Sequence, residues 1–203
     1  MAKRTAAAIR EVVMRAGWGA FVVCIGASAC SVQAATATAY VNTNTTCMNV
    51  QSSMLTEIGE IVNNASGLPE TVPNGTLING HPITVECTVT DSGGTFNLNL
   101  YANDNVNGTT IITGSATSSG SSTLSGVFET VNSGAFDGTN CTLTFTFDSV
   151  ALPTQNPLAA GQIWGHVSCP DAAARGMVQD TDAGSGAATC DIESDILFEN
   201  CTQ

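Results

Sequence analysis

The sequence is poor in basic residues. Five Lys and Arg stand against seventeen Asp and Glu in 203 residues, a formal net charge of −12. Four of the five bases and one of the seventeen acids precede residue 35, so the remainder has Arg175 against sixteen acids, a formal charge of −15. Such a surface repels phosphates, which argues against nucleic-acid binding and against electrostatic docking on anionic lipid.

Histidine is rare in the sequence, and several catalytic and metal-binding motifs are absent. The chain has two histidines, His81 and His166. Because no Gly-x-Ser-x-Gly occurs, the sequence does not indicate a Ser-His-Asp hydrolase. Without a Cys-x-x-Cys pair, a structural zinc site is not indicated either. No run reaches the roughly 20 strongly apolar residues that a membrane-spanning helix needs. We expect no cofactor and no metal.

The first 34 residues have the character of an export signal. Basic residues come first, the apolar stretch 18–29 follows, and small residues close the segment. This order is typical of a secretory signal peptide. The predicted organisation is therefore a signal over 1–34 and a single domain over 35–203.

Two maturation sites remain open. Val32-Gln33-Ala34 suits an ordinary signal peptidase, which would leave Ala35 as the first mature residue. The alternative is Ala27-Ser28-Ala29-Cys30, which is similar to a lipobox except for Ala27, where Leu is usual. Cleavage there would leave an acylated Cys30 and hold the protein on the membrane by lipid alone. The chain would accordingly be secreted or periplasmic, or attached to the cell surface or outer membrane as a lipoprotein.

Six of the eight cysteines follow the export signal by either route. An even number of cysteines in an exported chain indicates a disulfide framework. Their positions along the predicted elements favour three pairs: Cys47–Cys87, Cys141–Cys201 and Cys169–Cys190. A local Cys190–Cys201 bridge is the alternative.

Short strands separated by turns dominate the region 35–203. One helix is expected over 52–63, where apolar residues recur at helical spacing. Alternating apolar and polar residues and Gly, Asn and Ser turns predict strands over 77–78, 83–89, 96–100, 109–117, 123–131, 142–147, 162–168 and 191–200. Asn79-Gly80 predicts a type I′ turn. Segment 36–41 is either a linker or a first strand, and 170–189 is expected to be a surface loop. We predict an all-β, disulfide-stapled antiparallel sandwich or barrel of about seven to eight strands with one short N-terminal helix.

Two groups of residues are candidate sites. Trp164 and His166 fall on one face of a predicted strand, opposite Ile163 and Val167, and could form a small recognition patch. Asp180, Asp182 and Asp191 have the spacing of a weak calcium loop, but Ser185 stands where that loop needs glycine.

Three motifs carry a family resemblance. They are the stretch 159–170 (AAGQIWGHVSCP), the segment 190–201 (CDIESDILFENC) and the strand 85–89 (VECTV). They resemble a group of uncharacterised exported proteins and lipoproteins of myxobacterial type. The resemblance implies a β-domain of the cell envelope and brings no known activity.

We therefore expect a non-enzymatic exported protein with a binding, adhesion or surface-structural role, whose partner is an unknown protein or surface ligand. Two alternatives remain open. A secreted hydrolase would need a cleft in which His81 or His166 meets a carboxylate and a serine. A pilin-like subunit would need a free donor strand such as 36–41.

Overall fold

Strands are the only regular elements in the described part of the chain. The computed structural model describes residues 33–43, 54–59, 71–106, 108–130, 134–147, 150–151, 156–175 and 189–203. Within these ranges, no helix is long and apolar enough to cross a membrane. Residues 33–203 belong to one compact unit.

Within the described ranges, nine strands of five or more residues build the fold. They are β1 (Thr36–Thr43), β2 (Met54–Ile58), β5 (His81–Asp91), β6 (Thr95–Asp104), β7 (Gly108–Thr117), β8 (Ser122–Thr130), β9 (Gly134–Thr144), β13 (Gln162–Arg175) and β14 (Thr189–Glu199). Two-residue strands complete the set: β3 (Val72–Pro73), β4 (Leu77–Ile78), β10 (Thr146–Phe147), β11 (Val150–Ala151) and β12 (Leu158–Ala159). The expected number of strands was too low, because β2 and β3 form by pairing with β1, and β10, β11 and β12 are too short to show an alternating pattern.

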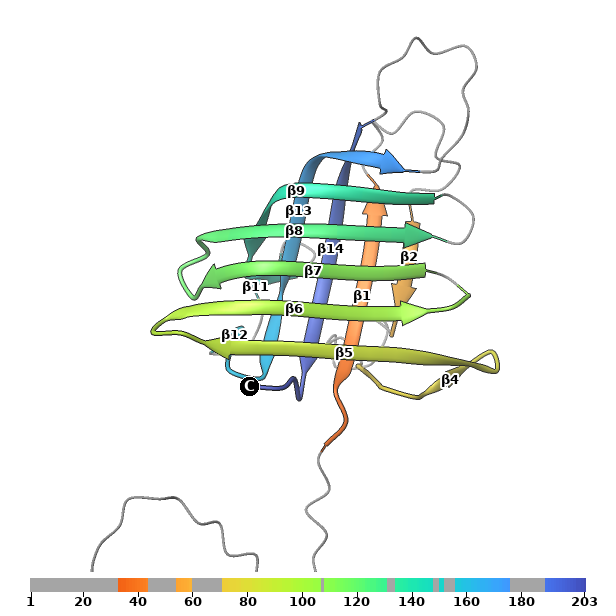
Figure 1. The fold of residues 1–203 in the computed structure, drawn as a ribbon, viewed down its shortest axis with the longest axis horizontal. Coiled ribbons are helices and arrows are strands. Elements are labelled where there is room, and N and C mark those ends of the chain that lie inside the picture. The colour runs from red at the N-terminus through yellow and green to blue at the C-terminus, as the bar shows by residue number, and fades with distance from the viewer. Residues whose placement is uncertain are drawn as a thin grey trace, which may run out of the picture. The chain divides into compact units, whose positions relative to one another are not determined.

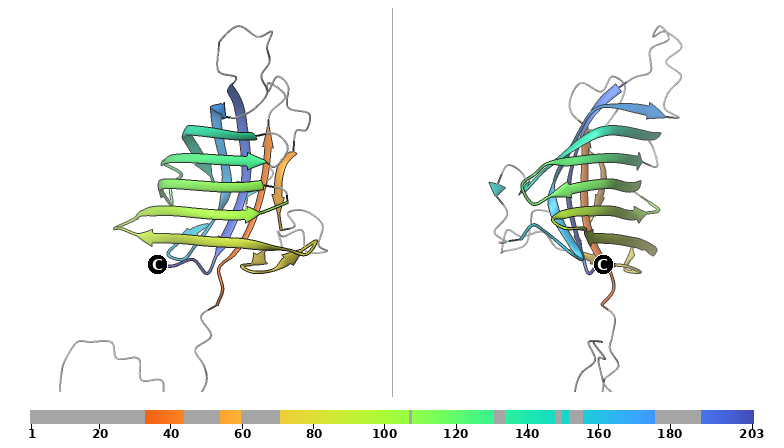
Figure 2. Two further views of the ribbon diagram at one scale, coloured as in Figure 1. Left: turned by 45° about the vertical axis from the view of Figure 1, so that its right-hand side comes forward. Right: turned by 60° about the vertical axis from the view of Figure 1, so that its left-hand side comes forward.

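One antiparallel sheet runs through almost all of these strands. Its order is β2-β1-β14-β13-β9-β8-β7-β6-β5-β4, with β3 beside β1 and β12 beside β13. The sheet curls into a half-barrel, so that β13, β14, β1 and β2 lie behind β5 to β9 and cross them steeply (Figure 1). We call β5 to β9 the front layer and the other four strands the back layer. The sheet bends from one layer to the other between the neighbouring strands β9 and β13 (Figure 2).

The core fills the space inside the curled sheet. Alternate residues of each long strand point inward, and the largest fully buried side chains include Phe128 and Phe136 of the front layer and Phe198 of the back layer. On β6, Phe96, Leu98 and Leu100 are buried while the asparagines between them are exposed. This confirms the predicted alternation. The Asn79-Gly80 turn is also confirmed, because both residues have positive φ, 51° and 83°.

The predicted helix over 52–63 is wrong where the structure describes it. Residues 54–58 form β2, whose Glu57 and Ile58 pair with Tyr40 and Ala39 of β1. Ile58 is fully buried in the core. The helical spacing of the apolar residues was a local signal, and pairing with β1 overrides it. Residues 52–53 and 60–63 lie outside the described residues.

The N-terminal segment is an internal strand of the sheet. Thr36 to Thr43 pair with β14 on one side, and β2 and β3 pair with the other side. A free donor strand at 36–41, which the pilin-like alternative required, is therefore wrong. The expected loop at 170–189 is also wrong at its start, because β13 continues to Arg175 and rejoins β9 beyond a bend.

All three predicted disulfide pairs, and the alternative Cys190–Cys201 bridge, are wrong. Cys87 is bonded to Cys201, and Cys141 is bonded to Cys169. Cys190 is also disulfide-bonded, so none of the five described cysteines is a free thiol. Cys141 and Cys169 lie on neighbouring strands at the bend, whereas Cys87 and Cys201 join the front layer to the end of β14. The sequence order of the cysteines carries no information about these registers.

The Cys87–Cys201 bridge belongs to a larger seam that closes one end of the fold. Thr202 lies parallel to β5: its N–H donates to the Cys87 carbonyl over 2.9 Å and its carbonyl accepts from the Val89 N–H over 3.0 Å. The Gly161 N–H donates to the Val89 carbonyl over 3.0 Å. This seam covers part of the edge of β5, which would otherwise expose unpaired main-chain groups.

Candidate functional site

The outer face of β13 carries the residues that the sequence singled out. Trp164, His166 and Ser168 are half-buried on this face, whereas the intervening Ile163 and Val167 are fully buried in the core. The predicted common face of Trp164 and His166 is therefore present.

Pairing with β14 brings two carboxylates to the histidine. His166 lies opposite Asp195, and Ser168 lies opposite Glu193. The His166 Nδ1 is 2.7 Å from Asp195 Oδ1, and the Nε2 is 2.7 Å from Glu193 Oε2. The Ser168 hydroxyl donates to Glu193 Oε1 over 3.0 Å. We call these four residues the histidine cluster.

The geometry fixes the protonation of the ring. A carboxylate can only accept, so each ring nitrogen must carry a proton to hold its bond, and the ring is then an imidazolium. The hydrogen bond to Asp195 raises the pKa of His166 above its usual 6.5, and Glu193 adds to this effect; burial opposes it. With Asp195 10% and Glu193 35% exposed at the side chain, the cluster is sheltered but reachable from solvent.

The cluster does not have the arrangement of a catalytic triad. In a triad, one histidine nitrogen accepts the proton of the serine while an acid holds the other. Here both ring nitrogens of His166 face carboxylates, and the hydroxyl of Ser168 is directed at Glu193. The histidine therefore has no free nitrogen with which to act as a base, and Ser168 has no base to activate it.

Aromatic side chains border the cluster. Tyr40 of β1 lies opposite Asp195, and beyond it the exposed Glu57 of β2 lies opposite Tyr40. Trp164 is two residues before His166 on β13. Its indole Nε1 is buried and has no hydrogen-bond partner among the described residues. The outer face of the back layer thus combines rings and carboxylates around one histidine.

The other candidates among the described residues, His81 and Asp191, do not join the histidine cluster. His81 is exposed beside the Asn79-Gly80 turn at the edge of the front layer. Asp191 lies on β14, where its carboxylate accepts the Asp171 N–H over 3.2 Å. The other two calcium candidates, Asp180 and Asp182, lie outside the described residues, as do Cys30 and Cys47. Three or more potential metal ligands do not come together anywhere in the described ranges.

Sequence reasoning missed Ser168, Glu193 and Asp195 as partners of His166. Glu193 and Asp195 are two residues apart in a predicted strand, so strand periodicity alone places them on one face. The missing information was the register between β13 and β14, and no motif in either strand reveals it.

Comparisons with protein-family models, with curated proteins and with solved structures gave no match.

Proposed function

We propose that this chain is a non-enzymatic exported binding protein of the cell surface or extracellular space, and that the outer face of the back layer recognises its partner. The observation that carries the proposal is that both ring nitrogens of His166 are hydrogen-bonded to carboxylates. The cluster is therefore a charged surface with a fixed geometry. The disulfides fit this setting, since such bonds persist in oxidising compartments outside the cytosol.

The chemistry of this face favours a cationic partner. Glu57, Glu193 and Asp195 outnumber the single positive charge of His166, and Tyr40 and Trp164 offer rings beside them. Carboxylates attract Lys and Arg, and aromatic faces attract the same cations. A basic segment of another surface protein has the complementary chemistry.

Sedimentation with isolated envelopes of the producing cells tests this proposal, using the full chain after export. We expect the protein to co-sediment, and the bound fraction to fall in 0.5 M salt because salt screens charge attraction. Glu193→Gln and Tyr40→Ala should each weaken binding several-fold. Glu129→Gln, which removes an exposed carboxylate from the front layer, should leave binding unchanged. Equal binding by all three variants would remove the back face from consideration.

The secreted-hydrolase alternative makes a different prediction at the same residues. A serine activated by His166 would react with a fluorophosphonate probe and carry the label at Ser168. We expect no label there, because the Ser168 hydroxyl is donated to Glu193. A label that is lost in Ser168→Ala and in His166→Gln would establish the hydrolase instead.

Mode of attachment is a separate part of the proposal. Mass spectrometry of the mature protein distinguishes an acylated Cys30, which tethers the domain to a membrane, from a free Ala35, which releases it. Both residues precede β1 in the sequence.

A further inference from the structure

The outer face of the front layer carries two rows of uncharged polar side chains. Because neighbouring strands are in register, outward residues align across the sheet. One row is Thr88, Asn99, Thr113, Ser125 and Thr139. The next is Thr90, Asn97, Ser115 and Thr123. We call these the neutral rows. All nine residues are hydroxyl or amide residues, in a chain whose mature part has sixteen acids.

The side chains of the first row are free to bind a ligand. Among the described residues, none of the five makes a side-chain hydrogen bond, whereas Asn103 and Thr109 elsewhere on the same face bond to each other over 3.3 Å. The row therefore presents hydroxyl and amide groups, each able to donate and accept, at the spacing of adjacent strands, about 4.8 Å.

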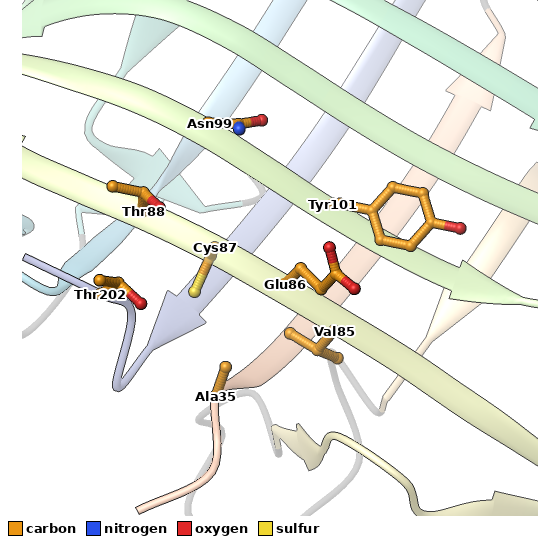
Figure 3. A pocket seen from close by; sticks show the side chains of 8 residues that line it. All are labelled: Ala35, Val85, Glu86, Cys87, Thr88, Asn99, Tyr101 and Thr202. Carbon is orange, nitrogen blue, oxygen red and sulfur yellow. The ribbon is translucent and has the colours of Figure 1, made fainter.

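A hollow of about 400 Å³ lies at the β5 end of this row. Glu86, Thr88, Asn99 and Tyr101 line its side on the sheet, and Ala35 and Thr202 line the side toward the edge of β5 (Figure 3). Tyr101 lies opposite Glu86 and is half-buried. The volume falls within the roughly 300–1,000 Å³ of small-ligand sites.

The lining defines the chemical class of the ligand. With no Lys or Arg in the hollow or the neutral rows, phosphate and carboxylate groups find no counter-charge, and the acidic chain repels them. The hollow is too polar for an oily ligand. A neutral sugar fits: its hydroxyls donate to Glu86 and exchange hydrogen bonds with Thr88 and Asn99, and its C–H face packs on the ring of Tyr101.

We propose that the hollow and the first neutral row bind a neutral glycan. One sugar ring lies in the hollow against Tyr101, and the chain continues across β6, β7 and β8 over Asn99, Thr113 and Ser125. The strand spacing along this row is close to the length of one sugar unit in an extended glycan, so successive rings meet successive side chains. This site is in the front layer and is independent of the face discussed under the proposed function.

Affinity electrophoresis of the exported full chain tests the site. Native gels would contain one of four neutral polysaccharides (dextran, hydroxyethylcellulose, galactomannan or xylan) or the anionic alginate. We expect at least one neutral polymer to retard the protein and alginate to leave its mobility unchanged. Tyr101→Ala should weaken the apparent affinity about tenfold or more, as loss of a central aromatic contact does.

Matched variants keep the test decisive. Glu129→Gln changes an exposed residue of the same layer outside the hollow and the neutral rows, and it should bind as the wild type does. Asn99→Ala and Thr113→Val change exposed residues and should weaken binding without loss of the fold, which circular dichroism checks. The proposal is overturned if none of the neutral polymers retards the protein, if alginate retards it as strongly, or if Glu129→Gln and Tyr101→Ala weaken binding equally.

Discussion

Asp195 and His166 lie directly opposite each other on β14 and β13, with Asp195 Oδ1 2.7 Å from His166 Nδ1. Asp195 is nearly buried, at 7% exposure of the whole residue. An ion pair in this position is well placed to influence both stability and surface charge, and its titration can be followed.

The stability contributed by His166 should depend on pH. The folded pKa is raised above 6.5, so the folded state holds the proton more tightly than the unfolded state. This contribution is complete below pH 6.5 and is lost as the pH rises through the folded pKa. We would measure the free energy of unfolding by denaturation from about pH 5.5 to about pH 9. The wild type should be more stable than His166→Gln by the largest amount at the acidic end, and this difference in stability should shrink as the pH rises. A difference that is constant or grows with pH would contradict the charged cluster.

Asp195→Asn should lower the free energy of unfolding by about 1–3 kcal/mol, because the buried end of a charge-assisted hydrogen bond is lost. Glu193→Gln should have a smaller effect, since that side chain is 35% exposed and solvent screens its charge. Urea denaturation at neutral pH measures both. If both variants lost the same free energy of unfolding, burial would not determine how much each carboxylate contributes to stability.

The two assigned disulfides should differ in their effect on stability. Cys87–Cys201 joins residues 114 apart and Cys141–Cys169 joins residues 28 apart. Chain entropy then predicts losses of about 4.8 and about 3.6 kcal/mol when each pair is replaced by alanine. Guanidinium denaturation of Cys87→Ala/Cys201→Ala and of Cys141→Ala/Cys169→Ala gives the order. A larger loss for the second pair would mean that local packing at the bend outweighs loop length.

Gly138 should tolerate no side chain while the neighbouring disulfide is present. A Cβ atom there would lie 2.7 Å from the Cβ of Cys169 and 2.9 Å from the Sγ of Cys141. We expect Gly138→Ala to lower the free energy of unfolding by about 1–3 kcal/mol. The same change in a Cys141→Ala/Cys169→Ala background should be milder, because both close contacts to sulfur are gone and only the contact to the Cβ of residue 169 remains. The thermodynamic cycle would contradict this explanation if the two losses were equal.

Two buried hydroxyls should be dispensable. Thr110 and Ser194 are at most 1% exposed, and their Oγ atoms have no hydrogen-bond partner in the described chain. Thr110→Val should raise the free energy of unfolding by about 1 kcal/mol, because valine has nearly the same shape as threonine and lacks the unpaired buried hydroxyl. Thr38→Val is the control: Thr38 is also fully buried, but its hydroxyl is not among the unpaired groups. We expect Thr38→Val to lower the free energy of unfolding. If Thr110→Val lowers it by as much, the Thr110 hydroxyl has a hydrogen-bond partner.

Local patterns predicted the parts of this fold that depend on neighbouring residues. The Asn79-Gly80 turn, the alternation along β6 and the shared face of Trp164 and His166 follow from backbone preference and side-chain period. β2 could not be predicted in this way, because its residues have helical spacing and become a strand only beside β1.

The disulfides and the histidine cluster depend on register between strands far apart in the chain. Glu193 and Asp195 were visible as acids on one face, but a shift of a single residue between β13 and β14 would have turned them away from His166. Cys87 and Cys201 likewise meet only because the chain end lies parallel to β5.

β1 also determines how the domain bears a load. Its eight residues are bonded to β14 along their whole length, β2 and β3 bond its other side, and the Ala35 carbonyl accepts the Asn74 N–H. Tension entering through residue 35 pulls along the strand and strains these bonds together in shear, whereas peeling an edge strand breaks them one by one. If Cys30 is acylated, a membrane tether would therefore load the domain through a strand that is paired on both sides.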